Sequence, residues 1–471
     1  MEKDVPIGWE EIELGDIADI TAGIGFPKKH QGNSKGAIPF YKVGDISKTV
    51  VRGDQWMTSA DHYIDESILK SLKGKLLPKG AIVFAKIGEA LKLNRRAILS
   101  EPALVDNNVM AVIPYCSNMD KFIYYFLLTE SLDKYSAGNA VPSVRKSSVL
   151  AIPFSLPSLP EQQRIVAKLD NLFGHHDSLK TRLNRIPQLL KDFRQKVLTQ
   201  AVTGKLTEKW RKGKELKEWK MKMMGDFVIK IQAGKNFNCP EYPVTENTVG
   251  LVKISAVTWG KFNPNETKTV LDKSKIYPEL FIKKGDFLMS RANTLELVGA
   301  SLIVDEIKFR IMLSDKIWRV TFKEEIDKRY VDFFLKSSIG RNEIESRATG
   351  NQLSMRNISH DSFKKIDLNY PPIEEQQEIV RLVESLFAKA DQIEASYKKL
   401  KVKIEQLPQA LLAKAFRGEL VEQLPIDGDA RELLEEIRKA KAGLEKGGRT
   451  KKMKENDEVR MVAEDGARYG K

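Results

Sequence analysis

Leu159-Pro160-Glu161-Gln162-Gln163-Arg164-Ile165-Val166 opens a segment that the chain repeats as Ile373-Glu374-Glu375-Gln376-Gln377-Glu378-Ile379-Val380. The two copies stand 214 residues apart (375 − 161). The same offset separates the closing motifs Thr203-Gly204-Lys205-Leu206 and Arg417-Gly418-Glu419-Leu420 (418 − 204). The segments therefore match in length without a gap, and a match at a fixed period indicates an internal structural repeat.

Both segments are predicted to be long helices, over residues 158–203 and 372–418. Prolines precede each one, where a missing N–H is tolerated, and a glutamate stands in each first turn, where the helix dipole favours it. Gly204 and Gly418 suit the end of a helix, because glycine readily takes the left-handed conformation found there.

Between these signals the apolar residues are spaced four and three apart, which is the heptad pattern of a coiled-coil seam. The pattern runs from residue 165 to 197 in the first copy and from 379 to 411 in the second. The positions predicted to form coiled-coil or subunit contacts are Ile165, Leu169, Leu172, Leu179, Leu183, Ile186, Ile379, Val383, Leu386, Ile393, Tyr397, Leu400 and Ile404.

Three residues depart from this pattern. Pro187 and Pro408 fall inside the predicted helices and remove a backbone donor, so each is expected to kink its helix or split it in two. The two prolines are not at equivalent positions, so the copies should bend differently. His176 takes a seam position, and because no metal partner lies near it in sequence we interpret it as a structural histidine.

The segments outside the helices mix short β-rich runs with turns and one modest helix each. We call residues 1–157 region 1 and residues 219–371 region 2; each has about 150 residues, a common size for one domain. Residues 204–218 form a basic linker. Residues 419–471 form a tail that is predicted to hold a short helix and then to be disordered.

Regions 1 and 2 also share matching motifs, but insertions and deletions change the offset between them. The offset is 210 at the opening tryptophans, Trp9 and Trp219, and 205 at the Lys-Gly pairs that begin at Lys79 and Lys284. It is 212 between Gly138-Asn139 and Gly350-Asn351. Strands are predicted over residues 81–85 and 287–289, and helices over residues 121–128 and 330–335.

Composition restricts the class of protein. The chain has 471 residues, of which 42% are hydrophobic and 30% charged, and its formal net charge is +14. This balance favours a globular protein with an anionic partner, most commonly nucleic acid, although a basic protein without such a partner stays open. Two distant cysteines, no signal peptide and no long apolar run predict a cytoplasmic protein without a metal site, a disulfide or a membrane span.

A search for catalytic motifs finds no convincing site. No Walker A loop is present, and Gly23-Ile24-Gly25 lacks the third glycine of a dinucleotide-binding loop. In Asn369-Tyr370-Pro371-Pro372 the aromatic residue precedes the prolines, whereas amino-methyltransferases place it after them, so we interpret this stretch as the start of a helix. One Glu306-x-Lys308 triplet is weak support for a nuclease.

The order region, helix, region, helix resembles the specificity subunit of type I restriction–modification systems, and the resemblance covers nearly the whole chain. Its most specific part is the Glu-Gln-Gln-x-Ile-Val motif that follows prolines within residues 157–166 and again within residues 371–380. The helix ends, Ala201 to Leu206 and Ala415 to Leu420, and the tryptophan at each region's start also resemble that family.

The resemblance implies an α+β chain in which two mixed α/β target-recognition domains are separated by two long helices packed as an antiparallel coiled coil, with a pseudo-two-fold repeat. Each domain would read one half of a split double-stranded DNA site. Two methyltransferase subunits would dock on the helices, and two restriction/translocase subunits would join them. S-adenosylmethionine, ATP and Mg²⁺ would belong to those partners, so that this chain would hold no cofactor and would catalyse nothing.

Candidate DNA contacts are basic or amide residues in loop-like stretches, because arginine and amide side chains suit base edges and lysines suit phosphates. They are Lys28, Lys29, Lys92, Arg95, Arg96, Asn139, Arg145, Lys146, Lys235, Asn236, Arg291, Asn293, Asn351, Gln352 and Arg356. The sets Gly138-Asn139…Arg145 and Gly350-Asn351…Arg356 are favoured, because they recur.

Two alternatives stay open at this point. A single-chain DNA methyltransferase or endonuclease would transfer methyl groups or cut DNA without partners. A coiled-coil interaction protein without a DNA role would show no salt-dependent binding to a duplex, whereas a DNA reader should lose affinity as salt rises.

Overall fold

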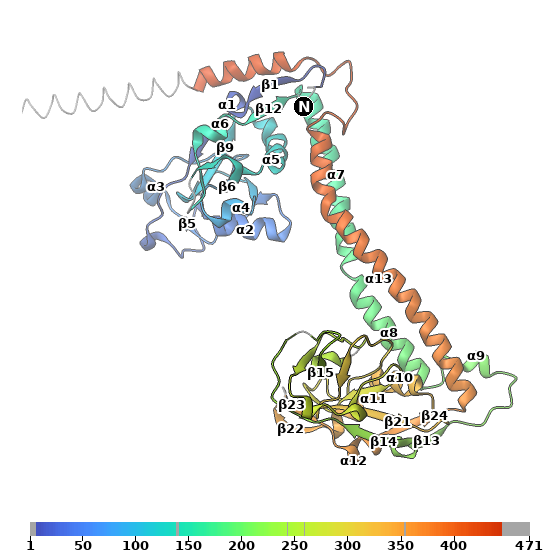
Figure 1. Cartoon of the computed structure of the whole chain (residues 1–471). Coiled ribbons are helices and arrows are strands. Elements are labelled where there is room, and N and C mark those ends of the chain that lie inside the picture. The colour runs from blue at the N-terminus through green and yellow to red at the C-terminus, as the bar shows by residue number, and fades with distance from the viewer. Residues whose placement is uncertain (1–5, 138–140, 243, 259, 353–354, 445–471) are drawn as a thin grey trace, which may run out of the picture. The chain divides into compact units, whose positions relative to one another are not determined.

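The computed structural model describes residues 6–137, 141–242, 244–258, 260–352 and 355–444, and Figure 1 draws the chain. Two compact units are present: unit 1 holds residues 1–181 and 401–471, and unit 2 holds residues 182–400. Each unit combines helices and strands. In the described part of the chain, no helix is both long enough and apolar enough to cross a membrane.

Region 1 is built on a five-stranded sheet with the order β2-β9-β6-β7-β4. These strands are β2 (Ala18–Ala22), β9 (Val109–Pro114), β6 (Ile82–Ala85), β7 (Arg96–Leu99) and β4 (Trp56–Met57). In β6, Ile82 and Phe84 pack in the cluster of helix α5 (Asp120–Thr129), whereas Val83 packs in the cluster of Ile46 from helix α2 (Val43–Arg52). Successive side chains point to opposite faces, so a strand covered on both faces is apolar throughout.

A smaller sheet completes region 1. Its strands are β5 (Tyr63–Ile64), β3 (Ile38–Tyr41) and β8 (Leu104–Val105), of which β3 and β8 are parallel. Strand β1 (Glu10–Glu13) pairs with β12 (Pro153–Leu156), so the start and the end of the region lie side by side. The other elements are α1 (Leu14–Ile17), η1 (Lys28–His30), α3 (Glu66–Leu72), α4 (Glu89–Lys92), η2 (Ser117–Met119), η3 (Leu132–Tyr135), β10 (Ser136–Ala137), β11 (Ser143–Val144) and α6 (Lys146–Leu150).

Region 2 repeats this topology. Its four-stranded sheet, β14-β21-β17-β19, consists of β14 (Val228–Ala233), β21 (Ile317–Phe322), β17 (Phe287–Ser290) and β19 (Ser301–Ile303). In its first three-stranded sheet, β15 (Val249–Val252) pairs antiparallel with β16 (Thr267–Val270) and parallel with β20 (Arg310–Met312), as β3 pairs with β5 and β8. Strand β13 (Lys220–Met223) pairs with β24 (Asp367–Tyr370), as β1 pairs with β12.

The remaining elements of region 2 complete the correspondence. They are η4 (Met224–Asp226), η5 (Ile254–Ala256), η6 (Lys273–Lys275), η7 (Pro278–Leu280), β18 (Ala292–Asn293), α10 (Lys328–Lys336), α11 (Ser338–Arg347), β22 (Thr349–Gln352), β23 (Met355–Asn357) and α12 (His360–Lys364). Helix α10 takes the place of α5, as the predicted helices over residues 121–128 and 330–335 require.

A glycine is needed at one matched point of the two regions. Gly23 donates its N–H to the carbonyl of Val109 at 3.0 Å, and Gly234 donates to that of Ser314 at 3.1 Å. A Cβ atom at Gly23 would lie 2.1 Å from the carbonyl oxygen of Asp106, and one at Gly234 would lie 1.8 Å from that of Leu313. The repeated Ala-Gly pair therefore marks a place where two backbones approach too closely for any side chain.

The two predicted long helices differ in whether the proline inside each one interrupts it. The first is split into α7 (Leu159–Leu183) and α8 (Ile186–Val202), and Pro187 lies in the first turn of α8. The second is one helix, α13 (Ile373–Ala415), with Pro408 inside it. The expectation that Pro187 breaks its helix is met, whereas the helix is not split at Pro408.

Within each unit, segments of these helices lie against each other in opposite directions. In unit 1, Ile165 and Leu169 share a core cluster with Leu412 and Ala415, while His176, farther along α7, contacts Ile404. In unit 2, α8 shares a core cluster with the first turns of α13. Arg194 of α8 forms ion pairs with Asp391 at 2.7 Å and Glu394 at 2.9 Å.

The predicted seam is buried only in part. The positions nearest regions 1 and 2, such as Ile165, Leu169, Ile379 and Val383, are fully buried. Three others are about half exposed: Leu179 at 48%, Ile393 at 52% and Leu400 at 47%. At these three positions the packing within the chain covers the seam incompletely, so their role in coiled-coil or subunit contacts stays a prediction.

The tail packs on unit 1. Residues 430–444 are helical, and Leu433, Leu434 and Ile437 are buried in the same core cluster as helix α5. Arg431 pairs with Glu10 at 2.7 Å, which attaches this helix beside strand β1. The basic linker contains the short helix α9 (Glu208–Arg211). The predicted disorder after the tail helix lies outside the described residues.

Candidate nucleic-acid interface

Five predicted DNA contacts of region 2 gather on one small sheet. Strand β17 leads through Arg291 into β18, which pairs with β23, and β23 pairs with β22. Asn293 lies opposite Arg356 in this register. Asn351 and Gln352 lie on β22, at the far side of β23. Segments that are far apart in sequence therefore meet in one small sheet, in which the backbones of these polar and basic residues lie close together.

Two arginines of this sheet are only partly exposed. The Nε atoms of Arg291 and Arg356 are buried and, among the described residues, have no hydrogen-bond partner. Neither guanidinium forms an ion pair within the described part of the chain, in contrast to Arg319 nearby in sequence, which pairs with Asp286 at 3.0 Å. Burial, helped by Lys364 and Arg291, lowers the pKa of His360. An anion arriving here would meet cations that no described acidic side chain neutralises.

A cleft of about 570 Å³ adjoins this sheet. It is lined by Asn236 and Asn293, which were both predicted, and by Lys253, Lys268 and Lys316, which were not. Lys253 and Lys268 share Glu241, at 2.9 and 3.4 Å, and lower the pKa of that carboxyl. The cleft therefore combines amide groups and lysines, which suit base edges and phosphates, with one carboxylate, Asp315.

Region 1 has matching backbone hydrogen bonds at this place but different side chains. The N–H of Lys86 donates to the carbonyl of Asn108, and that of Arg291 to the carbonyl of Lys316, both at 2.9 Å. Ile87 bridges to Ser143 just as Ala292 pairs with Asn357. Lys86 therefore stands where region 2 has Arg291. Sequence reasoning missed Lys86, although the offset of 205 seen at the Lys-Gly pairs leads directly to it (291 − 86).

The structure corrects the predicted match of Arg145 with Arg356. Arg145 precedes helix α6 and corresponds to Ser359, which precedes α12. The residue of region 1 that corresponds to Arg356 is Pro142, because Ser143 and Asn357 are equivalent. The offset is 214 here rather than 211, so a three-residue slip made two unrelated arginines look equivalent. Asn139 lies outside the described residues.

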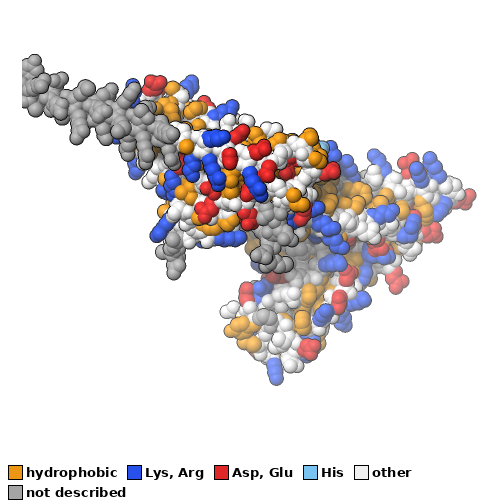
Figure 2. All heavy atoms as spheres, turned by 90° about the horizontal axis from the view of Figure 1, so that it is seen from above, with side chains coloured by type: hydrophobic (Ala, Val, Ile, Leu, Met, Phe, Trp, Pro, Cys, Tyr) orange, Lys and Arg blue, Asp and Glu red, His pale blue; other side chains and the backbone are white. Residues whose placement is uncertain are grey.

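The other candidate contacts of region 1 differ in availability. Lys28, Lys29 and Arg145 are exposed, and Arg95 is partly exposed. Two exposed lysines already have acidic partners: Lys92 pairs with Glu89 at 2.7 Å, and Lys146 with Asp19 at 2.9 Å. Figure 2 shows basic and acidic side chains interspersed on the face of unit 1 that is turned toward the viewer. The net positive charge does not form a single patch on that face.

Arg96 is wrongly predicted as a DNA contact. Its side chain is 1% exposed, and its guanidinium donates to the carbonyls of Asn94 and Glu130 at 2.8 and 2.6 Å. Burial lowers its pKa to about 10. A guanidinium whose donors are used inside the fold cannot reach a duplex. In region 2, Lys235 lies over the ring of Tyr277 at 3.7 Å, and Asn236 beside it is exposed.

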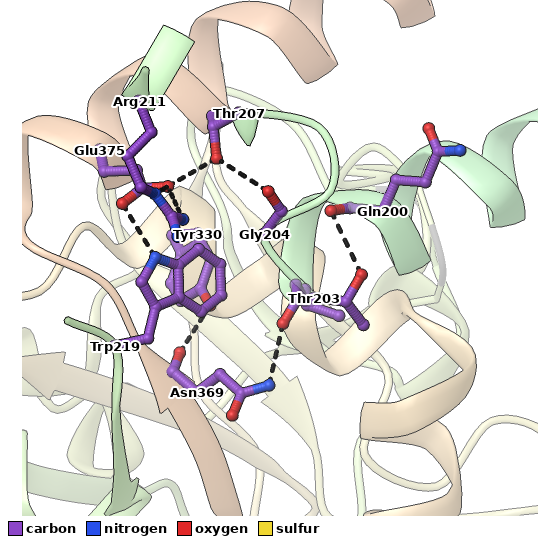
Figure 3. Close-up of polar contacts among 10 residues, drawn as sticks. Gln200, Thr203, Gly204, Thr207, Arg211, Trp219, Tyr330, Asn369 and Glu375 are labelled. Carbon is purple, nitrogen blue, oxygen red and sulfur yellow. Dashed lines mark hydrogen bonds and ion pairs between the residues drawn. The ribbon is translucent and has the colours of Figure 1, made fainter. Parts of the chain in front are cut away.

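The repeated Glu-Gln-Gln motif joins segments of the fold and does not belong to the candidate interface. In unit 2 the carboxylate of Glu375 is fully buried and accepts from Trp219 Nε1 at 2.8 Å and Thr207 Oγ1 at 2.6 Å, as Figure 3 shows. It also pairs with Arg211. Gln376 donates to the carbonyl of Pro371 at 2.9 Å. The start of region 2, the linker and helix α13 thus meet at one carboxylate.

Unit 1 contains a sparser version of this cluster. Glu161 accepts from Trp9 Nε1 at 3.0 Å, and Gln162 donates to the carbonyl of Pro157 at 2.9 Å. The other carboxylate oxygen of Glu161 receives no hydrogen bond of good geometry from the described residues. Burial raises the pKa of Glu161, although Trp9 and Gln423 stabilise its charge. Among the described residues, no arginine takes the place that Arg211 has in unit 2.

The residues that suggested catalysis have structural partners. Asn369 donates to the carbonyl of Val202 at the end of α8, at 3.0 Å, and its own carbonyl accepts from Tyr330 at 2.6 Å (Figure 3). The Asn369 side chain therefore caps the end of α8, and Pro371-Pro372 lead directly into α13, as the sequence interpretation held. Glu306 and Lys308 are exposed and 3.9 Å apart. Among the described residues, no three His, Cys, Asp or Glu side chains gather as metal ligands would.

Comparisons with known proteins agree on one family. The type I restriction modification DNA specificity domain matches residues 6–188 and 217–405. The chain is 28% identical over 471 residues to the EcoKI specificity subunit of Escherichia coli strain K12, covering 95% of this chain and 99% of that one. It is 26% identical to the EcoBI specificity subunit of Escherichia coli, covering 94% and 95%. A solved HsdS subunit from Thermoanaerobacter tengcongensis shares the fold, with a TM-score of 0.59 at 19% identity, over 88% of this chain and 98% of that one.

Proposed function

This chain belongs to the type I restriction modification DNA specificity family, and from that membership we propose that regions 1 and 2 each read one half of a two-part DNA site. It is a specificity subunit: it recognises DNA, and the catalytic steps belong to other subunits of the complex.

One observation carries this proposal: two regions of the same topology present different side chains at matched positions. Region 1 has Lys86 and Pro142 where region 2 has Arg291 and Arg356. A repeated frame would place two readers in the same relation to a duplex, and different side chains would make them read different bases. Arginines suit guanine edges and amides suit adenine edges, whereas lysines meet phosphates.

The residues that we propose as contacts follow from this frame and from exposure. They are Lys28, Lys29, Lys86, Lys92, Arg95, Arg145 and Lys146 in region 1, and Lys235, Asn236, Arg291, Asn293, Lys316, Asn351, Gln352 and Arg356 in region 2, together with Asn139, which lies outside the described residues. Lys86 and Lys316 are additions: the backbone contacts match Lys86 to Arg291, and Lys316 lines the cleft of region 2. Arg96 is left out because it is buried.

We propose further that the long helices pack as an antiparallel coiled coil and act as a spacer. The opposite directions of the paired segments within each unit support this arrangement. A helix of this kind rises about 1.5 Å per residue, so a fixed number of residues sets a fixed distance between half-sites. The equal length of the two repeated segments suits a spacer, because one extra residue would shift the seam.

The half-exposed seam residues Leu179, Ile393 and Leu400 support docking of partner subunits on the helices. We propose that two methyltransferase subunits bind there and that two restriction/translocase subunits join them. S-adenosylmethionine, ATP and Mg²⁺ would be bound by those partners, and this chain would hold none of them. The complex would act on chromosomal DNA in the cytoplasm.

The test is the methylation pattern of DNA treated with the assembled complex. We expect methylated sites to share two short sequences separated by a gap of constant length and free sequence. Duplex binding should weaken steeply with salt, by a logarithmic slope of about −0.9 for each phosphate that a cation neutralises. Methylated sites with one continuous sequence, or methyl transfer by this chain alone, would contradict the proposal.

A further inference from the structure

Pro408 leaves one backbone carbonyl of helix α13 without its ordinary partner. Proline has no N–H, so the carbonyl of Ile404, four residues before it, cannot receive the usual helical hydrogen bond. The helix nevertheless continues to Ala415. The Ile404 side chain is only 8% exposed, so water is a poor substitute at this face of the helix.

A histidine of the neighbouring helix fills the gap. His176 of α7 is 7% exposed, and its Nε2 lies 3.0 Å from the carbonyl oxygen of Ile404. A carbonyl can only accept, so Nε2 carries the hydrogen in this contact. The other ring nitrogen lies 3.2 Å from a carboxylate oxygen of Asp177, the next residue in its own helix. Both residues belong to unit 1.

The heptad pattern alone does not select one alignment of the helices, because a slip of one heptad again places seam positions opposite each other. The region 1 core favours the observed alignment, since Phe416, just after α13, packs against Phe122 and Phe126. The bond between His176 and Ile404 adds a polar constraint to these apolar contacts. A slip would separate His176 from the Ile404 carbonyl and leave two buried polar groups unpaired. Leaving buried polar groups without partners is costly, and a polar residue in an apolar seam is a known means of fixing register.

The repeat provides an internal comparison for this bond. At an offset of 214, the counterparts of His176, Ile404 and Pro408 are Ala390, Leu190 and Arg194 in unit 2. Arg194 has a backbone N–H, so the carbonyl of residue 190 is not deprived of its helical donor, and Ala390 offers no donor of its own. The proline and the histidine therefore occur together in one unit and are both missing from the matched place in the other.

We propose that the hydrogen bond between His176 and the Ile404 carbonyl, made possible by Pro408, locks the register of α7 against α13 and so helps to fix the gap between the two half-sites. The part about the gap rests on the proposed function. A slip of one heptad moves the helices by about 10 Å, which is the rise of about three base pairs. His176 is thus a positioning residue that acts without touching DNA.

The experiment assembles full-length variants with the methyltransferase partner and methylates a pool of random duplexes, whose modified sites are then sequenced. The wild type and His176→Gln, which keeps an N–H donor, should accept one gap. His176→Leu should also accept altered gaps, with the preference for the normal gap reduced by about tenfold or more. Thermal unfolding of His176→Leu should occur about 5 °C lower, because the Ile404 carbonyl is left unpaired.

The double variant His176→Leu/Pro408→Ala separates register from stability. The Pro408→Ala substitution restores the helical donor, so the Tm should return to near the wild-type value while altered gaps are still accepted. Leu190→Ala, at the counterpart of Ile404, should lower the Tm but keep one gap. If the double variant keeps a single gap with undiminished preference, the register lock is wrong. A wild type that selects no two-part site would contradict the proposed function instead. If the Tm of the double variant does not recover, the pairing of His176 with the Ile404 carbonyl is wrong.

Discussion

Regions 1 and 2 share the order of their equivalent strands and several matched backbone contacts, yet they differ at the side chains beside those contacts. The carbonyl of Lys86 accepts from Val144, and that of Arg291 accepts from Ile358, at 2.9 and 3.0 Å. Across the small sheet, region 2 has Arg356 where region 1 has Pro142. The difference teaches that the frame depends on main-chain hydrogen bonds, which leave the neighbouring side chains free to vary.

The two buried carboxylates show the reverse contrast: the side chain is the same in both units, but its partners differ. Glu161 and Glu375 occupy the same place at a helix start, and each accepts from the tryptophan that opens its region. Only Glu375 also accepts a hydrogen bond from Thr207 and forms an ion pair with Arg211. The frame is thus maintained in both units, but with unequal strength, and substitutions can test both sides of the comparison.

The largest effect is expected from exchanging a whole region. Replacing residues 1–157 by the corresponding region of a relative should change one half-site completely and leave the other unchanged, because each region has its own core. Discrimination for the old half-site should fall by about a thousandfold or more, since each mismatched base pair costs about 1–3 kcal/mol. Sequencing of methylated sites measures this. A change in both half-sites would show that the regions do not read independently.

The next effect concerns the two carboxylates. Glu375→Gln should lower the free energy of unfolding by about 2–3 kcal/mol, because it removes the charge that pairs with Arg211 and one acceptor of a buried group. Glu161→Gln is the matched control and should cost less than about 1 kcal/mol, because one oxygen can still accept from Trp9. Calorimetry of both variants gives the comparison, and equal losses would refute it.

A smaller effect is expected at Arg356. Arg356→Ala should reduce discrimination at one base pair of the region 2 half-site by about 1–3 kcal/mol and leave the other half-site as it was. Pro142→Ala, at the matched position of region 1, should change neither half, because proline offers no donor to a base. Competition binding with single-base-pair variants of the site measures both. Uniformly weaker binding after Arg356→Ala would reassign this arginine to a phosphate.

The smallest effect is a dependence on pH. Burial raises the pKa of Glu161, so the folded state holds this proton more tightly than the unfolded chain. The stability linked to Glu161 is therefore fully present below its ordinary pKa of about 4.3 and is lost as pH rises through its folded pKa. Urea unfolding at several pH values should show this slope in the wild type but not in Glu161→Gln. The same slope in both chains would assign it to another group.

Much of the frame could be predicted from the sequence, because its signals are local. Apolar runs gave the strands over residues 82–85 and 287–290, and the fixed offset gave the repeat. The heptad spacing gave the helices, but not which seam residues find a partner. Leu179 and Leu400 look like Leu169 in sequence, and only the packed structure shows that they stay half exposed.

The interface was harder to predict, because it depends on register between distant segments. Arg145 and Arg356 looked equivalent until the pairing of Ser143 and Asn357 placed them three residues apart. Arg96 looked like any other basic residue of a loop-like stretch, although its guanidinium is hydrogen-bonded to buried backbone carbonyls. Lys86 carries no signal of its own, and its match to Arg291 appears only when the two regions are compared, through the offset of 205 or through their backbone hydrogen bonds. Lys316 is found only from its place in the cleft.

The tail helix belongs to the core of region 1, although helix α13 and all of region 2 lie between them in the chain. Leu433, Leu434 and Ile437 complete a core whose other members include Trp9 and Phe122. Region 1 therefore keeps an apolar face open to water until residues 430–437 have been synthesised and packed. A chain that stops before residue 430 would contain regions 1 and 2 but would expose this face, which favours aggregation and proteolysis.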